Sequence, residues 1–359
     1  MSAPRPKQTI LEIEPYKAGR ATAPGFAKPI KISANENPLG ASPKARAAYL
    51  DAADKLHFYP DPRAGILREA IAAKYALDPA RIVFGTGSDE LFSLVCSAYL
   101  SPGDVMVQPQ WAFAAWAIAA RAAGAAVRAA PERDYHVDVD AMLAAVDANT
   151  RVVFMANPAN PTGTRIPRSE VVRFHKALRP DIVLVLDEAY AEFAQEPDDF
   201  SLADQPNVLI TRTLSKLYGL ASLRVGWGYG PADMIETLNK IRLPFNLSVP
   251  AIAAAHAALA DDTFAERSIA HAVGGRDKIS KLVTDLGLIA VPSATNFVTA
   301  RFPKDFPIAA PEATAALAER GVLVRGLEPY GMHDCFRISI STDEDWPAVE
   351  AALRAVIKR

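Results

Sequence analysis

Lys216 is the residue whose type and position most directly suggest chemistry. It ends the tetrapeptide Thr213–Lys216, directly after the apolar run Val208–Thr211. A lysine at the carboxyl end of a strand lies where α/β sheets hold their sites, and a lowered pKa makes it a Schiff-base nucleophile. Ser215 and Arg224 could bind phosphate oxygens beside it. A surface lysine with a structural arginine is the alternative interpretation of this motif alone.

A second motif, Asp187–Tyr190, follows the apolar run Ile182–Leu186. An aspartate at this point is either a helix cap or a site residue at the end of a strand. Pyridoxal phosphate requires a carboxylate against its pyridine nitrogen, because the protonated ring is an electron sink. Tyr190 could donate to the phenolic oxygen of the same ring. The motif therefore suits binding of this cofactor.

Two turns rich in glycine or proline supply the remaining groups. The stiff turn Asn157–Gly163 can aim the amide of Asn160 at the cofactor's O3′ oxygen, although an ordinary Asn-Pro turn is the alternative. In Gly85–Glu90, backbone N–H groups at a helix start and the Ser88 hydroxyl favour an anion. A dinucleotide fingerprint is not matched, because Glu90 stands where a glycine is needed. All these motifs follow predicted strands, so we expect them to converge on one pyridoxal phosphate.

Alternating strands and helices are expected to position these motifs. The alternation predicts an α/β fold, with a large domain whose mostly parallel sheet is flanked by helices. The predicted strands lack polar alternation, as expected for strands covered on both faces. They are Ile82–Phe84, Val105–Val107, Val127–Ala129, Val152–Met155, Ile182–Leu186 and Val208–Thr211. The predicted helices are Pro43–Lys55, Gly65–Lys74, Glu90–Leu100, Trp111–Ala123, Val139–Val146 and Arg168–Leu178.

The pattern changes after Pro244, where Ala-rich helices precede scattered strands and a closing helix at Trp346–Ile357. These features predict a smaller α+β C-terminal domain. The strands are expected at Asn296–Thr299, Val322–Val324 and Phe336–Ser339. We therefore expect an N-terminal arm (1–40) that packs with the small domain and a partner subunit, a large cofactor-binding domain (41–245) and a small domain (246–359).

Composition excludes several classes of partner. The net charge of −2 and the lack of basic clusters argue against nucleic acid and anionic membranes. The most apolar stretch, Val105–Ala120, is interrupted by Gln108 and is shorter than the ~20 residues of a spanning helix. No secretory signal is recognised. Cys96 and Cys335 are expected to be buried free thiols, which suits the cytoplasm. No metal site is predicted.

The chain resembles the fold-type-I pyridoxal-phosphate aminotransferases, and within them the histidinol-phosphate aminotransferase branch. Shared motifs run along nearly the whole sequence. They include Ser33-Ala-Asn-Glu-Asn-Pro-Leu-Gly40, Tyr59-Pro-Asp-Pro62, Asn160-Pro-Thr-Gly163, Asp187-Glu-Ala-Tyr190, Leu214-Ser-Lys216 and Pro244-Phe-Asn246. The Asn-Pro-Thr-Gly and Ser-Lys elements occur in many aminotransferases, whereas Ala-Asn-Glu-Asn-Pro, Tyr-Pro-Asp-Pro and Pro-Phe-Asn favour this branch.

The resemblance implies a role for each candidate in holding the cofactor. Lys216 would hold it and move the proton between the substrate Cα and the cofactor. Asp187 would pair with the pyridinium nitrogen, and Asn160 and Tyr190 with O3′. The phosphate would be bound by Ser88, Asp89 (through its backbone N–H), Ser215 and Arg224.

Other implied roles concern the ring, the partner subunit and the substrate. Trp111 would stack on the cofactor ring, with simple core packing as the alternative. Tyr59 would reach the cofactor of the neighbouring subunit, which implies a homodimer with shared active sites. Arg337 would anchor a substrate carboxylate or its equivalent, although an exposed ion pair is the alternative. The other substrate-binding residues would be Tyr16, Asn37 and Arg325.

The implied reaction transfers an amino group from L-histidinol phosphate to 2-oxoglutarate, forming imidazole acetol phosphate and L-glutamate in histidine biosynthesis. Some positions depart from the common pattern: Ala18 stands where proline is frequent, Trp111 where tyrosine is, and Ala159 where asparagine is. The alternatives are an aromatic-amino-acid (phenylalanine) aminotransferase, a threonine-phosphate decarboxylase and a non-catalytic binding module.

Overall fold

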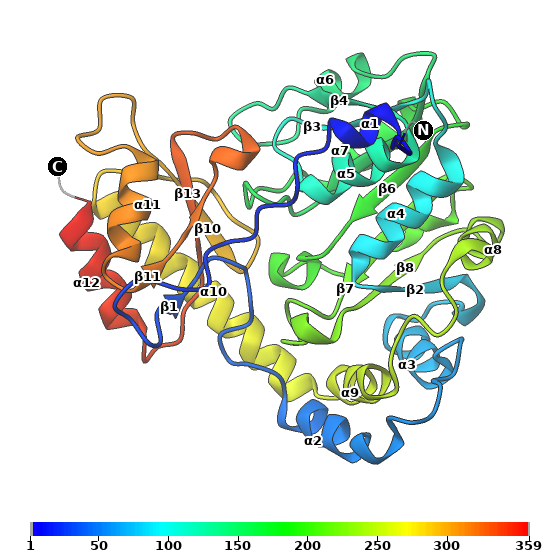
Figure 1. Ribbon diagram of the computed structural model, residues 1–359, viewed down its shortest axis with the longest axis horizontal. Helices are drawn as coiled ribbons and strands as arrows, with labels where there is room; N and C mark the ends of the chain where they lie inside the picture. Colours follow the sequence, from blue (N-terminus) through cyan, green and yellow to red (C-terminus); the bar gives the residue numbers. More distant parts are fainter. Residues whose placement is uncertain (1–2, 358–359) are drawn as a thin grey trace.

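A seven-stranded sheet forms the centre of the larger lobe in the computed structural model, which describes residues 3–357 (Figure 1). Its strands are β2 (Ile82–Thr86), β3 (Val105–Pro109), β4 (Ala126–Ala130), β5 (Thr150–Ala156), β6 (Val183–Asp187), β7 (Val208–Thr213) and β8 (Val225–Tyr229). Their order is β2-β8-β7-β6-β5-β3-β4, and β8 alone runs antiparallel to its neighbours. The predicted mostly parallel sheet is confirmed.

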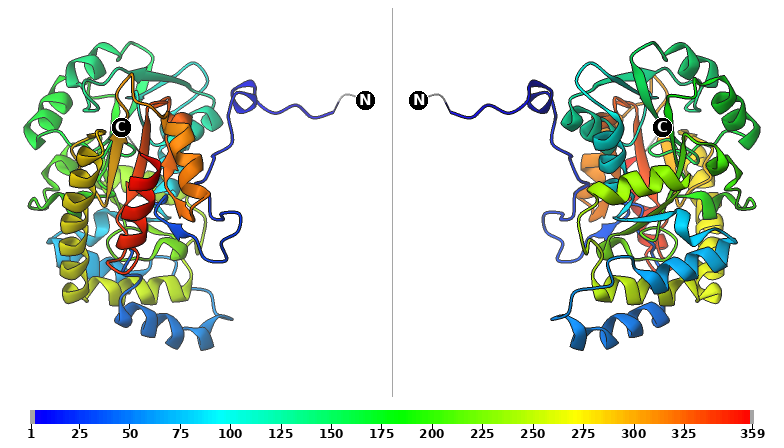
Figure 2. Two further views of the ribbon diagram at one scale, coloured as in Figure 1. Left: turned by 90° about the vertical axis from the view of Figure 1, so that its left-hand side faces the viewer. Right: turned by 90° about the vertical axis from the view of Figure 1, so that its right-hand side faces the viewer.

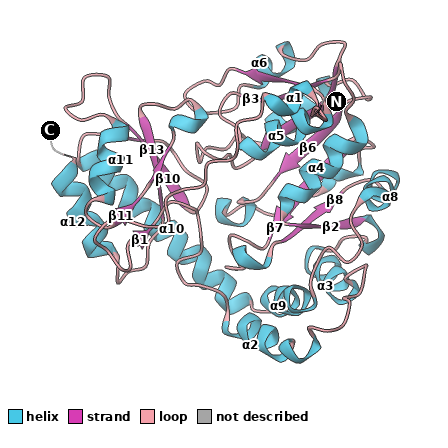
Figure 3. Ribbon diagram, in the orientation of Figure 1, coloured by secondary structure: helices cyan, strands magenta, loops and turns pink. Residues whose placement is uncertain are grey.

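Helices cover both faces of this sheet (Figure 3). Alternate residues of β6 show the division: Leu184 and Leu186 join one buried cluster, whereas Val183 and Val185 join the other. One face packs against α4 (Ser88–Tyr99), α5 (Ala114–Ala123) and α8 (Ala232–Ile241). The other packs against α3 (Gly65–Tyr75), α6 (Val139–Ala144), α7 (Arg168–Ala177) and α9 (Val249–Leu259). Burial on both faces explains why the strand sequences lack polar alternation.

Strand β8 is the element of the large sheet that the sequence did not predict. Its sequence is Val-Gly-Trp-Gly-Tyr, and the strand lies between β2 and β7 in the sheet. A Cβ at Gly226 would lie 2.2 Å from the backbone nitrogen of Ser88, so only glycine permits this approach. The approach brings Arg224, just before β8, beside the start of α4.

The smaller lobe contains an antiparallel sheet, which confirms the predicted α+β part. Its strand order is β12 (Arg325–Gly326), β13 (Cys335–Ser339), β10 (Phe297–Arg301) and β9 (Ile289–Ala290). The helices α11 (Ala310–Ala318) and α12 (Trp346–Val356) pack in its core. The long helix α10 (Asp262–Asp285) runs from the larger lobe to the smaller one (Figure 1). Its first half contributes Ala265 and Ala272 to the large core, and its second half contributes Ile279 to the small one.

The N-terminal segment lies on the outside of the molecule, and its first described residues project away from the body (Figure 2). After the short helix α1 (Gln8–Leu11), strand β1 (Ile30–Lys31) pairs in parallel with β11 (Val322–Leu323). Helix α2 (Pro43–Asp51) follows, and the Ser42 hydroxyl accepts from the Ala45 N–H at 3.0 Å, as the sequence predicted. The predicted helix continued to Lys55, but its last turn is a separate 3-10 turn.

Two further expectations concern the thiols and membranes. Cys96 and Cys335 are both free and buried, as predicted. Within residues 3–357, no helix combines the length and apolarity needed to span a bilayer.

Two adjacent glycines in the middle of α10 should respond oppositely to alanine. A Cβ on Gly275 would lie 2.4 Å from Cγ2 of the buried Ile340, whereas a Cβ on Gly274 would meet nothing within 4 Å. We expect Gly275→Ala to lower the free energy of unfolding by about 1–3 kcal/mol through overpacking. Gly274→Ala should raise it by about 0.5–1 kcal/mol, because alanine favours the helix. Urea unfolding of both variants measures this, and shifts in the same direction would contradict the packing described.

Candidate active site

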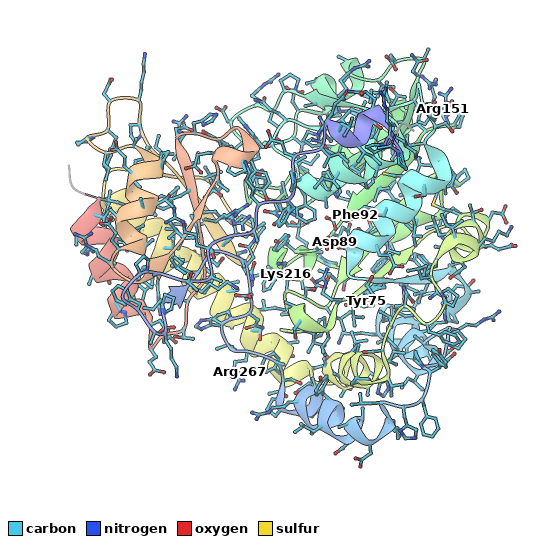
Figure 4. All side chains as sticks on the ribbon, viewed as in Figure 1. Tyr75, Asp89, Phe92, Arg151, Lys216 and Arg267 are labelled. Atoms are coloured by element: carbon cyan, nitrogen blue, oxygen red, sulfur yellow. The ribbon has the colours of Figure 1, made fainter. Side chains whose placement is uncertain are left out.

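A cavity of about 320 Å³ lies where the carboxyl ends of β2, β5, β6 and β7 face the smaller lobe. Lys216 and Asp89 lie in this central region of the molecule (Figure 4). The lining brings together most of the candidates: Tyr16, Ser88, Asp89, Asn160, Asp187, Tyr190, Ser215, Lys216, Arg224, Arg325 and Arg337. Residues far apart in sequence thus share one site, as expected when parallel strands end at the same edge of a sheet.

Lys216 lies in the cavity lining, and its amine is held by a single hydrogen bond among residues 3–357. Its Nζ donates to the carbonyl of Ala34 at 3.3 Å and lies 5.8 Å from the centroid of the Tyr190 ring. Desolvation, and to a smaller extent the nearby Arg337 guanidinium, lowers the pKa of Lys216 to about 8. The neutral amine is therefore far more accessible near neutral pH than in an ordinary lysine, which is what a nucleophile requires.

Asp187 is a buried carboxylate that forms no ion pair with a lysine, arginine or histidine among residues 3–357. It is 6% exposed, and its Oδ1 accepts from the Thr211 hydroxyl at 3.1 Å. Burial raises the pKa of Asp187 to about 7, against the opposing effect of the Thr211 hydrogen bond. A cation placed against this carboxylate would favour its ionised form. The Tyr190 hydroxyl, on the following turn, accepts from Asn35 Nδ2 at 2.9 Å.

The start of α4 forms an anion-binding cradle with Arg224. Gly87 occupies the N-cap with φ 77° and offers no side chain, so the first N–H groups of the helix lack a side-chain cap. A Cβ on Gly87 would lie 2.1 Å from Nη2 of Arg224, so any other residue here would displace the guanidinium from its present position. Arg224 donates to Asp89 Oδ2 at 2.7 Å and to Ser215 Oγ at 3.4 Å. Hydroxyls, a guanidinium and a helix start together suit a phosphate.

Arg337 closes the cavity from the smaller lobe. It is 5% exposed and donates to Asn160 Oδ1 and to the carbonyl of Ser33, the latter at 3.2 Å. Its Nε is buried and has no hydrogen-bond partner among residues 3–357, so the guanidinium does not use all of its donors in this structure. Because Arg337 occupies the amide oxygen of Asn160, the amide nitrogen is left to donate elsewhere.

Comparison with known proteins assigns the chain to a family. Residues 27–354 match the family model described as Aminotransferase class I and II. The chain belongs to the class I and II aminotransferases.

Individual relatives within this aminotransferase family are similar over nearly their whole length. The chain is 48% identical over 358 residues to histidinol-phosphate aminotransferase 1 of Caulobacter vibrioides, covering 99% of this chain and 100% of that protein. It is 46% identical to the histidinol-phosphate aminotransferase of Rhodospirillum rubrum, and the match covers 98% of this chain and 96% of that protein. A similar solved structure is the crystal structure of the histidinol-phosphate aminotransferase from Sinorhizobium meliloti in complex with pyridoxal-5'-phosphate. It superposes with a TM-score of 0.85 at 33% identity, and the match covers 92% of this chain and 91% of that chain.

Three of the predicted site residues, Trp111, Asn37 and Tyr59, do not line the cavity. Trp111 was expected to stack on the cofactor, but its backbone N–H donates to Glu132 Oε1 at 3.0 Å and its ring stacks on Tyr135 at 4.8 Å. Phe113 lines the cavity instead. Asn37 was expected to contact substrate, but its amide donates to the carbonyl of Leu217 at 2.7 Å and to Ser268 Oγ at 3.1 Å.

Asn35 takes the place expected for Asn37. Its φ of 56° is a left-handed conformation, which turns its side chain toward Tyr190 and Ser339 and into the cavity lining. The motif Ser33–Gly40 pointed to this loop, but a loop without strand or helix periodicity does not reveal which asparagine faces inward.

Three outer candidates occupy distinct positions. Arg325 lines the cavity and donates to the carbonyl of Lys17 at 2.6 Å, which ties the arm to the smaller lobe. Tyr16 lines the cavity from that arm. Tyr59 is 82% exposed outside the cavity and stacks on Phe245, with ring centroids 4.7 Å apart. Its expected role concerns a second subunit.

Proposed function

We propose that this chain is a pyridoxal-phosphate-dependent aminotransferase acting on L-histidinol phosphate and 2-oxoglutarate in histidine biosynthesis. The observation that carries the proposal is the convergence of Lys216, Asp187, Asn160, Arg224 and Arg337 on one cavity. Family membership and long, similar relatives with that activity in their names support it. The products would be imidazole acetol phosphate and L-glutamate.

The residues present fit the cofactor in charge and donor type. The cradle of Gly87, Ser88, Ser215 and Arg224 supplies donors for a phosphate, and the buried Asp187 lacks the cation that a protonated pyridine nitrogen would provide. When bound, the cofactor supplies an electron sink for the electron pair left at the substrate Cα.

Each side chain of the site would then have a separate role in the reaction. Lys216 would hold the cofactor covalently and, once released from it, carry the proton removed from Cα. Asp187 would keep the ring nitrogen protonated, and Asn160 and Tyr190 would donate to O3′. Arg337 would orient the substrate by gripping its carboxylate or phosphate, with Arg325 and Tyr16 at the entrance.

Substrate preference is the experiment that tests the proposed function. We expect kcat/KM for histidinol phosphate to exceed that for phenylalanine, because basic side chains (Arg325 and Arg337) line the substrate end of the cavity and favour an anionic donor. Both donors should be measured with 2-oxoglutarate as acceptor. A preference for phenylalanine above about tenfold, roughly 1.4 kcal/mol of transition-state binding, would refute this substrate.

A homodimer with shared active sites is also proposed. Large apolar side chains are exposed at Leu56 (68%), Phe58 (62%), Ile66 (58%) and Leu243 (69%), in the same region as Tyr59. Exposed apolar surface of this kind typically marks an interface. Tyr59 would reach the partner's phosphate cradle from this surface. Sedimentation equilibrium should give about twice the chain mass of 38.6 kDa, and a monomer that is fully active would contradict shared sites.

The domain division and the compartment are proposals as well. Packing of α9 and the first half of α10 in the large core favours a boundary inside α10 over one near residue 245. The arm would contact both the small domain and the partner. Two free buried thiols are consistent with the reducing conditions of the cytoplasm.

A further inference from the structure

We propose that Thr211 is a positioning residue, whose hydroxyl favours the ionised form of the Asp187 carboxylate and fixes it in the orientation that receives the cofactor ring. This inference rests on the proposed function, since it concerns how the aspartate meets pyridoxal phosphate. Thr211 does not line the cavity and would act only through Asp187.

The sheet fixes these two residues side by side. Thr211 and Asp187 are register partners on the parallel strands β7 and β6. Thr211 is fully buried, and its Oγ1 donates to Asp187 Oδ1 at 3.1 Å. The backbone is also held: the Glu188 N–H donates to the Thr211 carbonyl at 2.9 Å, and the Asn157 N–H donates to the Asp187 carbonyl at 3.1 Å. The hydroxyl therefore meets the carboxylate in one geometry.

The neighbouring carboxylate shows what Asp187 lacks. Glu188 is also buried, but it accepts from Arg168 at 3.1 Å and from Arg212 at 2.8 Å. Among residues 3–357, no lysine or arginine forms an ion pair with Asp187. The Thr211 hydroxyl is therefore the side-chain donor on which this carboxylate depends before the cofactor binds.

The charges around Asp187 otherwise oppose its ionisation. Burial, with smaller contributions from the carboxylates of Asp89 on α4 and of Glu188, raises its pKa to about 7, against the hydrogen bonds from Thr211 and from the Ala189 backbone N–H. Tyr190, on the turn after β6, is an uncharged neighbour at this pH, because burial raises the pKa of its hydroxyl. Loss of the Thr211 hydrogen bond would raise the pKa of Asp187 above its present value. A smaller fraction of the protein would then have an ionised Asp187 near pH 7.

A purely structural role for Thr211 is the competing explanation, because β-branched residues suit a buried strand. Thr211→Val separates the two, since it keeps the shape of the side chain and removes the hydroxyl. Thr150→Val is the matched control. Thr150 is also fully buried, and its hydroxyl donates to Asp147 Oδ1 at 3.0 Å, but it lies at the other end of its strand and does not line the cavity.

The test is titration of the apo protein with pyridoxal phosphate at pH 7 and pH 8.5, with thermal unfolding of each variant in parallel. For Thr211→Val we expect a Kd about tenfold higher at pH 7, which corresponds to roughly 1.4 kcal/mol. The difference in Kd between Thr211→Val and the wild type should be smaller at pH 8.5, because Asp187 is ionised there even with a raised pKa. Thr211→Ser should bind within about twofold of the wild type, and so should Thr150→Val.

Each outcome decides a separate point. An equal Kd for Thr211→Val and the wild type at both pH values would overturn the inference, and so would a loss that does not depend on pH. If Thr211→Val does not fold, Thr211→Ala removes the hydroxyl without adding bulk and is judged by the same criteria. Failure of the wild type to bind pyridoxal phosphate would instead overturn the proposed function.

Discussion

Replacing Lys216 with alanine is expected to lower kcat for amino transfer by at least about 10⁴-fold, the largest effect of any single substitution. The variant loses both the covalent attachment and the group that carries the proton at Cα. Desolvation and the nearby Arg337 lower the pKa of this amine to about 8, whereas Lys31, the other lysine that lines the cavity among residues 3–357, forms an ion pair with Glu36 at 2.9 Å. Stopped-flow or coupled assays with glutamate as donor measure the loss.

A matched control is Lys281→Ala, which removes an exposed lysine from α10. Lys281 forms only a surface ion pair with Asp285 at 2.8 Å, so activity should stay within about twofold of the wild type. Activity of Lys216→Ala within about tenfold of the wild type would show that another group carries the proton.

Asp187→Asn should have the second largest effect, lowering kcat by about 10²–10³-fold while preserving the shape of the side chain. The amide cannot carry the negative charge that keeps the ring nitrogen protonated, so the electron sink weakens. Cofactor affinity should fall as well. Kinetics and cofactor titration of the same preparation measure both quantities.

Glu188→Gln provides the contrast one residue further along the chain. Glu188 accepts from two arginines away from the cavity, so its loss should lower stability by about 3–5 kcal/mol. Folded Glu188→Gln should nevertheless keep kcat near the wild-type value. If Asp187→Asn changed only stability, and Glu188→Gln changed kcat, the roles assigned to the two carboxylates would be reversed.

Much of the large sheet could be predicted because its strands are buried on both faces. Continuous apolar runs marked β2 to β7, and the candidates at their carboxyl ends, such as Asp187 and Lys216, do line one cavity. Strand β8 escaped prediction because two glycines interrupt its apolar pattern, and those glycines are explained by contacts distant in sequence. Helix α11 was also missed, because its Ala-rich segment carries little amphipathic pattern.

The predicted site residues that do not line the cavity lie in loops, where side-chain direction has no period. The left-handed backbone of Asn35, rather than any local pattern, selects it over Asn37. Trp111 follows β3 as expected of a site residue, yet its backbone N–H donates to Glu132 and its ring stacks on Tyr135. Thr211 was not singled out either, because its role depends on the register between β6 and β7.

The identity of the lysine that holds the cofactor tests the central claim most directly. The protein, loaded with pyridoxal phosphate, would be reduced with borohydride to make the covalent link permanent, then digested and analysed by mass spectrometry. We predict the added mass on Lys216 and on no other lysine. Modification of a different lysine, or of none, would contradict the assignment of Lys216 and the function built on it.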